Sequence, residues 1–389
     1  MILTGARVAI SARQGEKTSL FLRRGRAFLS GKPLWRERKI DLSGFLILPG
    51  LINAHDHLEF NLFPRVGHGP YPNASAWAKD IFRPNEPPLS EHLTIPKSLR
   101  LFWGGIKNLL SGVTSVAHHN PYQADVFEKE FPVRVLKRFG WAHSLEFSPD
   151  WEQRFRQTPP DVPFILHAAE GTDDEARNEV YRLDKSLALG PPMVLVHGVA
   201  LKAEDLPLLR SRKASLIWCP SSNCFTLGRT VPKEILESGI PISLGTDSAL
   251  TAEGDLIDEL RIASRSVDPF RLYEMITRAA AGILRLNSGE GCIRDGGIAD
   301  LLAVADHGQT PAHALLSLRP DLVLLGGRIK LVSKSLAHHF RRSELSGFHN
   351  MEVEERGRWL VPFDVGSLLK QTRQSLAGNV LLAGKAVTA

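Results

Sequence analysis

The sequence predicts a (β/α)8 barrel, a TIM-type α/β fold, with a small β-sandwich domain built from both ends of the chain. Three observations carry this prediction. Short apolar runs alternate with amphipathic runs of helical period between about residues 50 and 285. Such alternation is typical of parallel βαβ units, and seven or eight of them fit this span. Strand-like runs also stand near both chain ends.

These patterns divide the chain into four parts. Residues 1–48 and 289–335 are predicted to form the two parts of the β-sandwich. Residues 49–288 are predicted to form the barrel, and residues 336–389 a C-terminal helical tail. A chain of 389 residues is long enough for one large domain and a smaller one.

The elements follow in order along the chain. The N-terminal part reads as short strands in ARVAIS, SLFLRRGRAFLS and KIDLSG. From Phe45 a nearly continuous apolar run predicts a strand buried on both faces, which opens the barrel. A helix is predicted from Pro96, with Gly112 placed to end it. Further strands are predicted in VTSVAHH, FILHAAE, MVLVHG, SLIWCP and PISLGTDS, and the last four each precede a helical run.

Two regions of the chain are harder to assign. Residues 133–161 leave little room for the third and fourth strands of a barrel. Strand-like sequence recurs after residue 290 in GGIADLLAVAD and DLVLLGGRIKLVS. We expect these strands to pair with the N-terminal strands. In the tail, VGSLLKQTRQSLAG predicts one helix.

Composition excludes several classes of protein. The net charge is +6, but no long Lys/Arg run or basic stripe is present, so a nucleic-acid partner is not expected. Three cysteines without regular spacing argue against a disulfide framework and predict a cytoplasmic location. We expect no signal peptide and no membrane span, because the N-terminus lacks a long apolar run and no stretch of 18 apolar residues occurs.

Polar side chains stand at the predicted carboxyl ends of the buried strands, where parallel barrels carry their active sites. These residues are His55, His57, His167, Glu170, His197 and Asp247. Burying imidazoles and carboxylates is costly without a compensating role.

Each of these residues also has an ordinary structural explanation. An HxH pair such as His55 and His57 often arises by chance in a loop. Glu170 suits a helix N-terminus, and Asp247 suits a helix cap. His197 by itself reads as a hydrogen-bonded core histidine.

Their order on successive strands favours a metal site. The side chains of residues two apart on a strand point to the same face, so His55 and His57 can bind one ion. His167 would add a third nitrogen and Asp247 an oxygen, which leaves an open position for water, as a catalytic site requires.

The motifs LPGLINAHDH, HAAE, VHGVAL, CPSSN and LGTDS resemble the amidohydrolase superfamily. They resemble most closely its mononuclear branch, which includes cytosine, guanine and S-adenosylhomocysteine deaminases and the triazine hydrolases. The resemblance implies that His55, His57, His167 and Asp247 bind one divalent metal ion, Zn²⁺ or alternatively Fe²⁺. It implies that Glu170, together with His197 and Asp247, performs the catalytic proton transfers.

The resemblance also bears on the number of metals. Binuclear members carry a carboxylated lysine on the fourth strand, and the predicted strand WAHSLEF holds no lysine. Glu146 could bridge two metals instead, whereas the HxxE motif of His167 and Glu170 favours one.

The implied activity is hydrolysis of carbon–nitrogen bonds other than peptide bonds. The first hypothesis is a deaminase that releases ammonia from a purine, pyrimidine, pterin or triazine by attack of metal-bound hydroxide. A second hypothesis keeps the site but hydrolyses a cyclic amide or a C–Cl bond. A third is a barrel that binds metal without turnover.

The partner is then a small-molecule substrate, and the resemblance is compatible with a homodimer. Substrate contacts are expected from loops after the strands. The candidates are His118, His119, His143, Glu146, Asn223 and Ser248.

Overall fold

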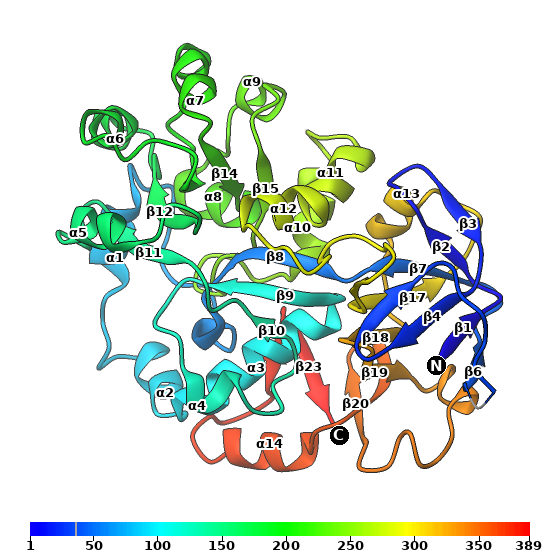
Figure 1. Cartoon of the computed structure of the whole chain (residues 1–389). Coiled ribbons are helices and arrows are strands. Elements are labelled where there is room, and N and C mark those ends of the chain that lie inside the picture. The colour runs from blue at the N-terminus through cyan, green and yellow to red at the C-terminus, as the bar shows by residue number, and fades with distance from the viewer. Residues whose placement is uncertain (36) are drawn as a thin grey trace.

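The computed structural model describes residues 1–35 and 37–389 and shows an α/β fold built around parallel strands (Figure 1). The strands form two parallel sheets in the orders β10-β9-β8 and β11-β12-β13-β14-β15. Neighbours in these sheets follow one another along the chain, which is what βαβ units produce. Their bounds are β8 (Leu51–Asp56), β9 (Val113–His118), β10 (Arg134–Val135), β11 (Gly140–Ser144), β12 (Phe164–Ala168), β13 (Met193–His197), β14 (Ser215–Trp218) and β15 (Ile242–Leu244).

The two parallel sheets meet at the carboxyl ends of β8 and β15. The backbone nitrogens of Thr246 and Asp247 donate to the carbonyl oxygen of His55 at 2.9 and 3.1 Å. Asp56 and Asp247 form a parallel bridge. On the other side, no ladder joins β10 to β11 within the described residues. β10 is only two residues long, in line with the little room that the sequence leaves for the third unit.

Alternate residues of the parallel strands face a common interior. Because successive strand side chains point to opposite faces, every second residue can join one core. A single buried cluster gathers such residues with the end of helix α12, namely Ile52, Ala54, Ala117, Ile165, Val194, Val196, Ile217, Ala280 and Ile283. The residues between them face outward to the helices, as Leu166 and Leu195 do in the larger core.

Helices separate most of the parallel strands and lie outside them (Figure 1). They are α3 (Lys97–Leu110), α4 (Ala124–Phe127), α5 (Trp151–Gln157), α6 (Asp174–Lys185), α7 (Leu206–Arg212), α8 (Pro220–Leu227), α9 (Lys233–Leu236), α10 (Leu256–Ala263), α11 (Pro269–Met275) and α12 (Arg278–Ile283), with a short 3-10 turn η2 (Ala203–Asp205). The helix predicted from Pro96 is α3, and Gly112 follows it with a φ of +80°. Side-chain caps start others, as Asp173 does for α6. None of the described helices is long and apolar enough to cross a membrane.

A long excursion between β8 and α3 was not predicted from the sequence. It contains η1 (Leu58–Phe60), α1 (Ala74–Ile81) and α2 (Leu89–Leu93). Asn73 caps α1 by accepting from the backbone nitrogen of Ala76. The excursion is rich in Pro and Gly and has no long apolar period, so its fold depends on contacts with distant loops.

Two mixed sheets combine both ends of the chain. The five-stranded sheet has the order β16-β5-β4-β1-β6, and the ten-stranded sheet has the order β22-β23-β20-β21-β19-β18-β17-β7-β2-β3. Figure 1 shows the blue N-terminal strands beside the yellow and orange strands of residues 297–333. The bounds are β1 (Ile2–Thr4), β2 (Arg7–Ala9), β3 (Gly15–Lys17), β4 (Leu20–Arg23), β5 (Arg26–Phe28), β6 (Lys39–Asp41), β7 (Phe45–Pro49), β16 (Gly297–Ile298), β17 (Leu301–Ala305), β18 (Leu322–Leu325) and β19 (Arg328–Ser333).

The two mixed sheets share a hydrophobic cluster, which includes Leu3 and Leu22 from one and Ile47 and Val332 from the other. The apolar run from Phe45, predicted as one strand, divides at Gly50 into two. β7 pairs with β17 and β2 in the mixed sheet, whereas β8 begins the parallel sheets. An added Cβ at Gly50 would lie 2.2 Å from the Thr114 hydroxyl oxygen, so the crossing requires glycine.

The C-terminal segment contains the predicted helix and several strands that the sequence analysis did not predict. The helix is α14 (Val365–Thr372), and the strands are β20 (His349–Val353), β21 (Gly357–Val361), β22 (Leu381–Leu382) and β23 (Lys385–Thr388). β21 pairs with β19 and extends the ten-stranded sheet. The Trp103 indole nitrogen of α3 donates to the Thr372 hydroxyl of α14 at 2.8 Å in the core. The remaining short helices are α13 (Pro311–Leu316) and η3 (Ala337–His339).

Candidate metal centre

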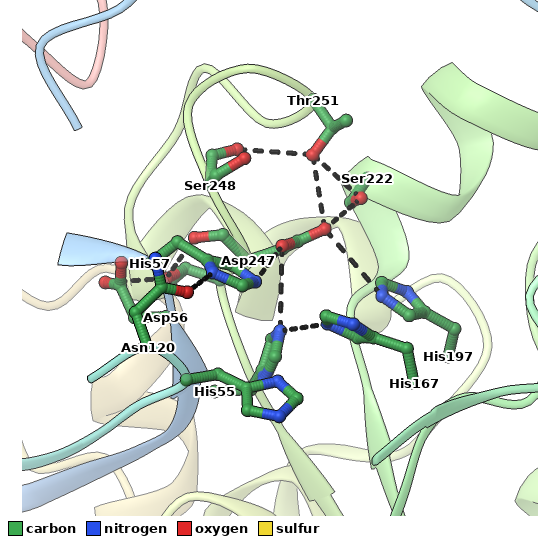
Figure 2. Close-up of polar contacts among 12 residues, drawn as sticks. His55, Asp56, His57, Asn120, His167, His197, Ser222, Asp247, Ser248 and Thr251 are labelled. Atoms are coloured by element: carbon green, nitrogen blue, oxygen red, sulfur yellow. Dashed lines mark hydrogen bonds and ion pairs between the residues drawn. The ribbon is translucent and has the colours of Figure 1, made fainter. Parts of the chain in front are cut away.

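The carboxyl ends of β8, β12, β13 and β15 bring imidazoles and a carboxylate together (Figure 2). His55 Nε2 lies 3.1 Å from His167 Nε2 and 3.6 Å from Asp247 Oδ1. His57 Nε2 lies 3.5 Å from the same carboxylate oxygen, and His197 Nε2 lies 3.9 Å from Asp247 Oδ2. All five side chains are buried. The sequence-predicted metal residues therefore meet at one point.

The ligand atoms fall into two overlapping groups in which every pair lies within 4.8 Å. Both groups contain His55 and His167. One adds His57 and His119, and the other adds His197 and Asp247. The predicted set of His55, His57, His167 and Asp247 thus spans both groups, joined by the His57–Asp247 contact.

These donors fit a divalent metal. Donors held about 2.1 Å from one ion lie roughly 3.0–3.4 Å apart, close to the 3.1 Å that separates the His55 and His167 nitrogens. Two neutral imidazoles that approach so closely need a cation or a shared proton between them. Three further nitrogen donors and one carboxylate surround this pair. The site supports binding of a divalent metal.

Burial keeps His55 and His167 in the neutral form that binds metals. Burial, opposed by Asp247, lowers the pKa of His55 to about 4. Burial and the neighbouring imidazoles hold the pKa of His167 well below its ordinary value. For Asp247, burial opposes ionisation, but the contacts with His55, His197 and His57 outweigh it and hold the pKa well below the usual range. Neutral imidazoles and an ionised carboxylate are the protonation states that a metal requires.

Two asparagines orient the imidazoles from behind. The His57 Nδ1 proton is donated to Asn120 Oδ1 at 2.8 Å, and the His197 Nδ1 proton to Asn223 Oδ1 at 2.7 Å. An amide oxygen can only accept, so each Nε2 keeps its lone pair and faces the centre. Partners of this kind fix the tautomer of ligating histidines. Asn223 was predicted to contact substrate; the structure shows that its oxygen holds His197, while its nitrogen has no partner among the described residues.

Asp56, the middle residue of the HxH pair, lies outside the ligand groups. Its Oδ2 accepts from Asn108 Nδ2 at 2.8 Å and Thr246 Oγ1 at 3.0 Å, and its Oδ1 accepts from Asn61 Nδ2 at 2.8 Å. These buried bonds tie β8 to α3 and to the loop after β15. Similarly, Asp247 Oδ2 accepts from the Ser222 hydroxyl at 2.5 Å.

Glu170 lies beside the cluster, with Oε1 at 3.5 Å from His197 Nε2. Burial, followed by repulsion from Asp247 and Glu179, raises the pKa of its carboxyl group well above the ordinary value. Burial and this repulsion therefore favour the protonated form of Glu170. The backbone is strained at nearby strand ends, because Ala169, His197 and Asp247 adopt φ values of 54°, 79° and 57°. Such strain clusters at functional sites.

The excursion after β8 covers the centre. The backbone nitrogen of Ala74 donates to the Glu170 carbonyl at 3.1 Å, and Asn73 forms a bridge with Gly171. The backbone nitrogen of Tyr71 donates to the Thr226 carbonyl at 2.7 Å. Sequence reasoning missed this cover because no periodic pattern marks it.

The other residues predicted to contact substrate lie in different surroundings in the structure. His118 lies against Glu59, with 3.2 Å between Nε2 and Oε2, whereas His119 lies in a ligand group. His143 packs beside His167, with ring centroids 4.7 Å apart, and lines a small pocket of about 30 Å³ that also reaches Glu170.

Glu146 lies at the rim of this pocket and bonds to the Ser75 hydroxyl and Lys79. It belongs to neither ligand group. Ser248 is buried next to Asp247, and its carbonyl oxygen accepts from the Thr251 hydroxyl at 3.2 Å. The pocket therefore places His143 and Glu146 beside His167 and Glu170, and its lining includes neither His118 nor Ser248.

Comparisons with known proteins give a family match and several relatives. Residues 164–330 match the amidohydrolase family. The chain is 26% identical to a 5-methylthioadenosine/S-adenosylhomocysteine deaminase of Halobacterium salinarum, over 90% of each chain. It is 26% identical to the protein of the same name from Pyrococcus furiosus, over 68% of this chain and 76% of the relative.

Solved structures share the fold at lower identity. An adenosine deaminase from Xanthomonas campestris with bound zinc has a TM-score of 0.71 at 17% identity, covering 96% of this chain and 97% of that one. An atrazine chlorohydrolase from Arthrobacter aurescens complexed with zinc has a TM-score of 0.72 at 17% identity, covering 96% and 99%. Residues 164–330 thus match the amidohydrolase family, and the chain shares its fold with both of these zinc-bound structures.

Proposed function

We propose that this protein is a metal-dependent aminohydrolase that releases ammonia from a nitrogen heterocycle. One observation carries the proposal: the half-buried Glu170, whose pKa is raised well above its ordinary value, lies beside a cluster of buried imidazoles and Asp247, whose pKa is held well below its usual range. This pairing joins a proton donor to a metal site, as hydrolysis of an amino group from a heterocycle requires. The names of the relatives, which are deaminases, support it.

We infer that the eight parallel strands form a (β/α)8 barrel with its weakest seam at β10 and β11. The common interior and the bridge between β8 and β15 support this inference. We also infer that the two mixed sheets form a β-sandwich built from residues 1–48 and 289–335, flanking a barrel of residues 49–288. The C-terminal segment, 336–389, adds strands and a helix to this frame.

His55, His57, His167 and Asp247 would hold the metal in this proposal. We propose zinc, because imidazole and carboxylate donors suit it and zinc is bound in both solved structures described above. Ferrous iron is the alternative, since imidazole suits both ions. A divalent metal held here would supply a bound water molecule with its pKa lowered towards neutrality.

Proton transfers fall to the side chains around the metal. Glu170 donates its proton to a ring nitrogen, which makes the adjacent carbon electrophilic. Asp247, with its Oδ2 fixed by Ser222, accepts a proton from the attacking water. When the C–O bond has formed, Glu170 takes the proton of the new hydroxyl group and passes it to the amino group, which leaves as ammonia as the C–N bond breaks. The proton held by Asp247 then restores the proton on Glu170. His197, oriented by Asn223, faces Glu170 and positions its carboxyl group.

We propose aminopurines as the first substrates to test, because the relatives are adenosine-type deaminases by name. The His143 imidazole and the free Asn223 amide nitrogen are buried polar groups that could bond to ring nitrogens. The homodimer and the cytoplasmic location expected from the sequence stay predictions.

The test is ammonia release from the zinc-loaded and iron-loaded protein. A panel of adenosine derivatives, cytosine, guanine, aminopterins and aminotriazines should give ammonia from one group of compounds. Chloride from a chlorotriazine, or ring opening of a cyclic amide without ammonia, would instead favour the second hypothesis. Metal-loaded protein that is silent with every compound and shows no thermal shift with any of them would favour a barrel that binds metal without turnover.

A further inference from the structure

His119 occupies a position that the expected ligand set leaves out. It follows the end of β9, is 1% exposed, and shares a ligand group with His55, His57 and His167. Its ring centroid lies 4.6 Å from that of His167 and 4.9 Å from that of His55. A fourth imidazole thus meets the three expected to bind the metal.

The hydrogen bond of His119 prepares one nitrogen for coordination. His119 Nε2 lies 3.0 Å from the backbone carbonyl oxygen of Ala142 on β11. A carbonyl can only accept, so Nε2 carries the proton and Nδ1 holds a lone pair. Nδ1 is buried and has no hydrogen-bond partner among the described residues. Histidines that bind metals commonly donate their other nitrogen to a backbone carbonyl in this way.

A purely structural role does not explain this arrangement, because a buried nitrogen without a partner costs free energy. A substrate contact explains it poorly as well. His143 and His167 line the small pocket beside Glu170, whereas His119 does not. His119 therefore lies behind the imidazoles that substrate would reach first.

The neighbouring His118 provides an internal contrast. It is equally buried, at 1% exposed, but its Nδ1 accepts from the backbone nitrogen of Leu58 at 3.2 Å and its Nε2 faces Glu59. The Nδ1 of His118 is therefore hydrogen-bonded, its Nε2 lies at ion-pair distance from a carboxylate although it forms no hydrogen bond, and His118 belongs to neither ligand group. The two adjacent histidines thus have different surroundings.

We propose that His119 is a direct nitrogen ligand of the metal, in addition to the residues expected from the family resemblance. The proposal rests on the metal site of the proposed function and extends it from three imidazoles to four. Three observations support the assignment: His119 Nδ1 has no hydrogen-bond partner among the described residues, its Nε2 is hydrogen-bonded to the Ala142 carbonyl, and three imidazoles lie close to it.

The test compares metal binding in four proteins, without reference to turnover. Wild type, His119→Gln, His118→Gln and His55→Ala are loaded with Co²⁺. The visible spectrum of each is recorded, and metal affinity is measured by competition with a chelator. His119→Gln should alter the spectrum and weaken affinity by about 10-fold or more, the loss expected when even an indirect partner of a metal is removed. His118→Gln should match wild type, and His55→Ala should show the loss caused by removing an expected ligand.

An unchanged spectrum and affinity in His119→Gln, with the loss present in His55→Ala, would overturn the proposal and leave the proposed function intact. If His119→Gln does not fold, a crystal structure of the cobalt-loaded wild type decides. A His119 nitrogen about 2.1 Å from the ion would support the assignment, and none within bonding distance would overturn it. Absence of ammonia release by a protein that binds metal through His119 would count against the proposed function alone.

Discussion

At the scale of single residues, the positions of the side chains in the metal centre and the contacts that orient them have different physical origins. His55, His57, His167, His197 and Asp247 were placed together because each stands at the end of a buried strand, and the structure gathers them. Backbone periodicity sets those positions.

The orienting contacts depend on loop conformation instead. Asn120 and Asn223 accept hydrogen bonds from the imidazoles of His57 and His197 across turns that no local sequence pattern describes. For the same reason, the sequence could not separate His118 from His119, which lie next to each other and face different surroundings.

Gly245 allows the loop after β15 to approach β8 closely, so a larger residue there should disturb the metal centre. An added Cβ there would lie 2.7 Å from the Cβ of His55 and 2.9 Å from its carbonyl oxygen. Gly245→Ala must therefore displace His55, and we expect metal affinity to fall by about 10-fold or more, since small displacements at a site are costly. Chelator competition measures the effect.

Gly282→Ala is the matched control, because a Cβ at Gly282 in α12 meets nothing within 4 Å. It should leave metal affinity unchanged and raise stability by about 0.5–1 kcal/mol. Equal metal affinity in Gly245→Ala and wild type would show that the contact with His55 is not as tight as described.

At the scale of elements, the alternation of strands and helices is predictable because strands such as β12 and β13 are fully buried and helices such as α3 and α6 are amphipathic. The order of β8 to β15 follows from right-handed βαβ units. The division at Gly50 was not predictable, because β7 and β8 are equally apolar and only their distant partners differ. The excursion over the centre was also missed, because its contacts with residues 170–172 and 226 are long-range.

Glu259 on α10 should make the stability of the protein depend on pH. Its carboxylate accepts from the backbone nitrogen of Ser221 on α8 at 3.0 Å and from the Ser221 hydroxyl. Burial outweighs these bonds and raises the pKa of Glu259 to about 8. The folded state therefore keeps a proton that the unfolded chain loses above about pH 4.3. This contribution to stability is fully present below about pH 4.3 and is lost as the pH rises towards 8.

Glu259→Gln removes this titration and retains a partner for Ser221. The stability of wild type relative to Glu259→Gln should fall by about 1.4 kcal/mol per pH unit across that window. Urea unfolding of both proteins at several pH values measures it. The exposed Glu234→Gln serves as the control and should track wild type. A difference between wild type and Glu259→Gln that stays constant with pH would contradict the assigned protonation state.

At the scale of the whole molecule, the C-terminal segment is part of the frame rather than a separate tail. The sequence predicted its helix, because α14 is amphipathic. Its strands are short and pair with distant elements, as β21 does with β19 and β20 does with β23. Pairing of this kind leaves little local signal, so the sequence did not predict it.

Arg356 joins this segment to the parallel-strand unit. Its guanidinium bonds to the buried Asp255 carboxylate, which caps α10, and lies 2.9 Å from Asp258. Arg356→Leu leaves Asp255 buried without its cation, so we expect a loss of about 3 kcal/mol or more in the free energy of unfolding. Arg358→Leu removes an exposed pair with Glu352 and should cost about 1 kcal/mol or less. Urea denaturation of both variants compares them, and equal losses would contradict the buried role of Arg356.

The central claim is that Glu170 transfers protons beside a bound metal. The most direct measurement is ammonia release by wild type and Glu170→Gln, each loaded with zinc to the same measured stoichiometry, on the best substrate from the heterocycle panel. We predict that Glu170→Gln lowers kcat by about 10²–10⁴-fold while metal content stays equal, because only the proton transfer is lost. Equal turnover in the two metal-loaded proteins would contradict the claim.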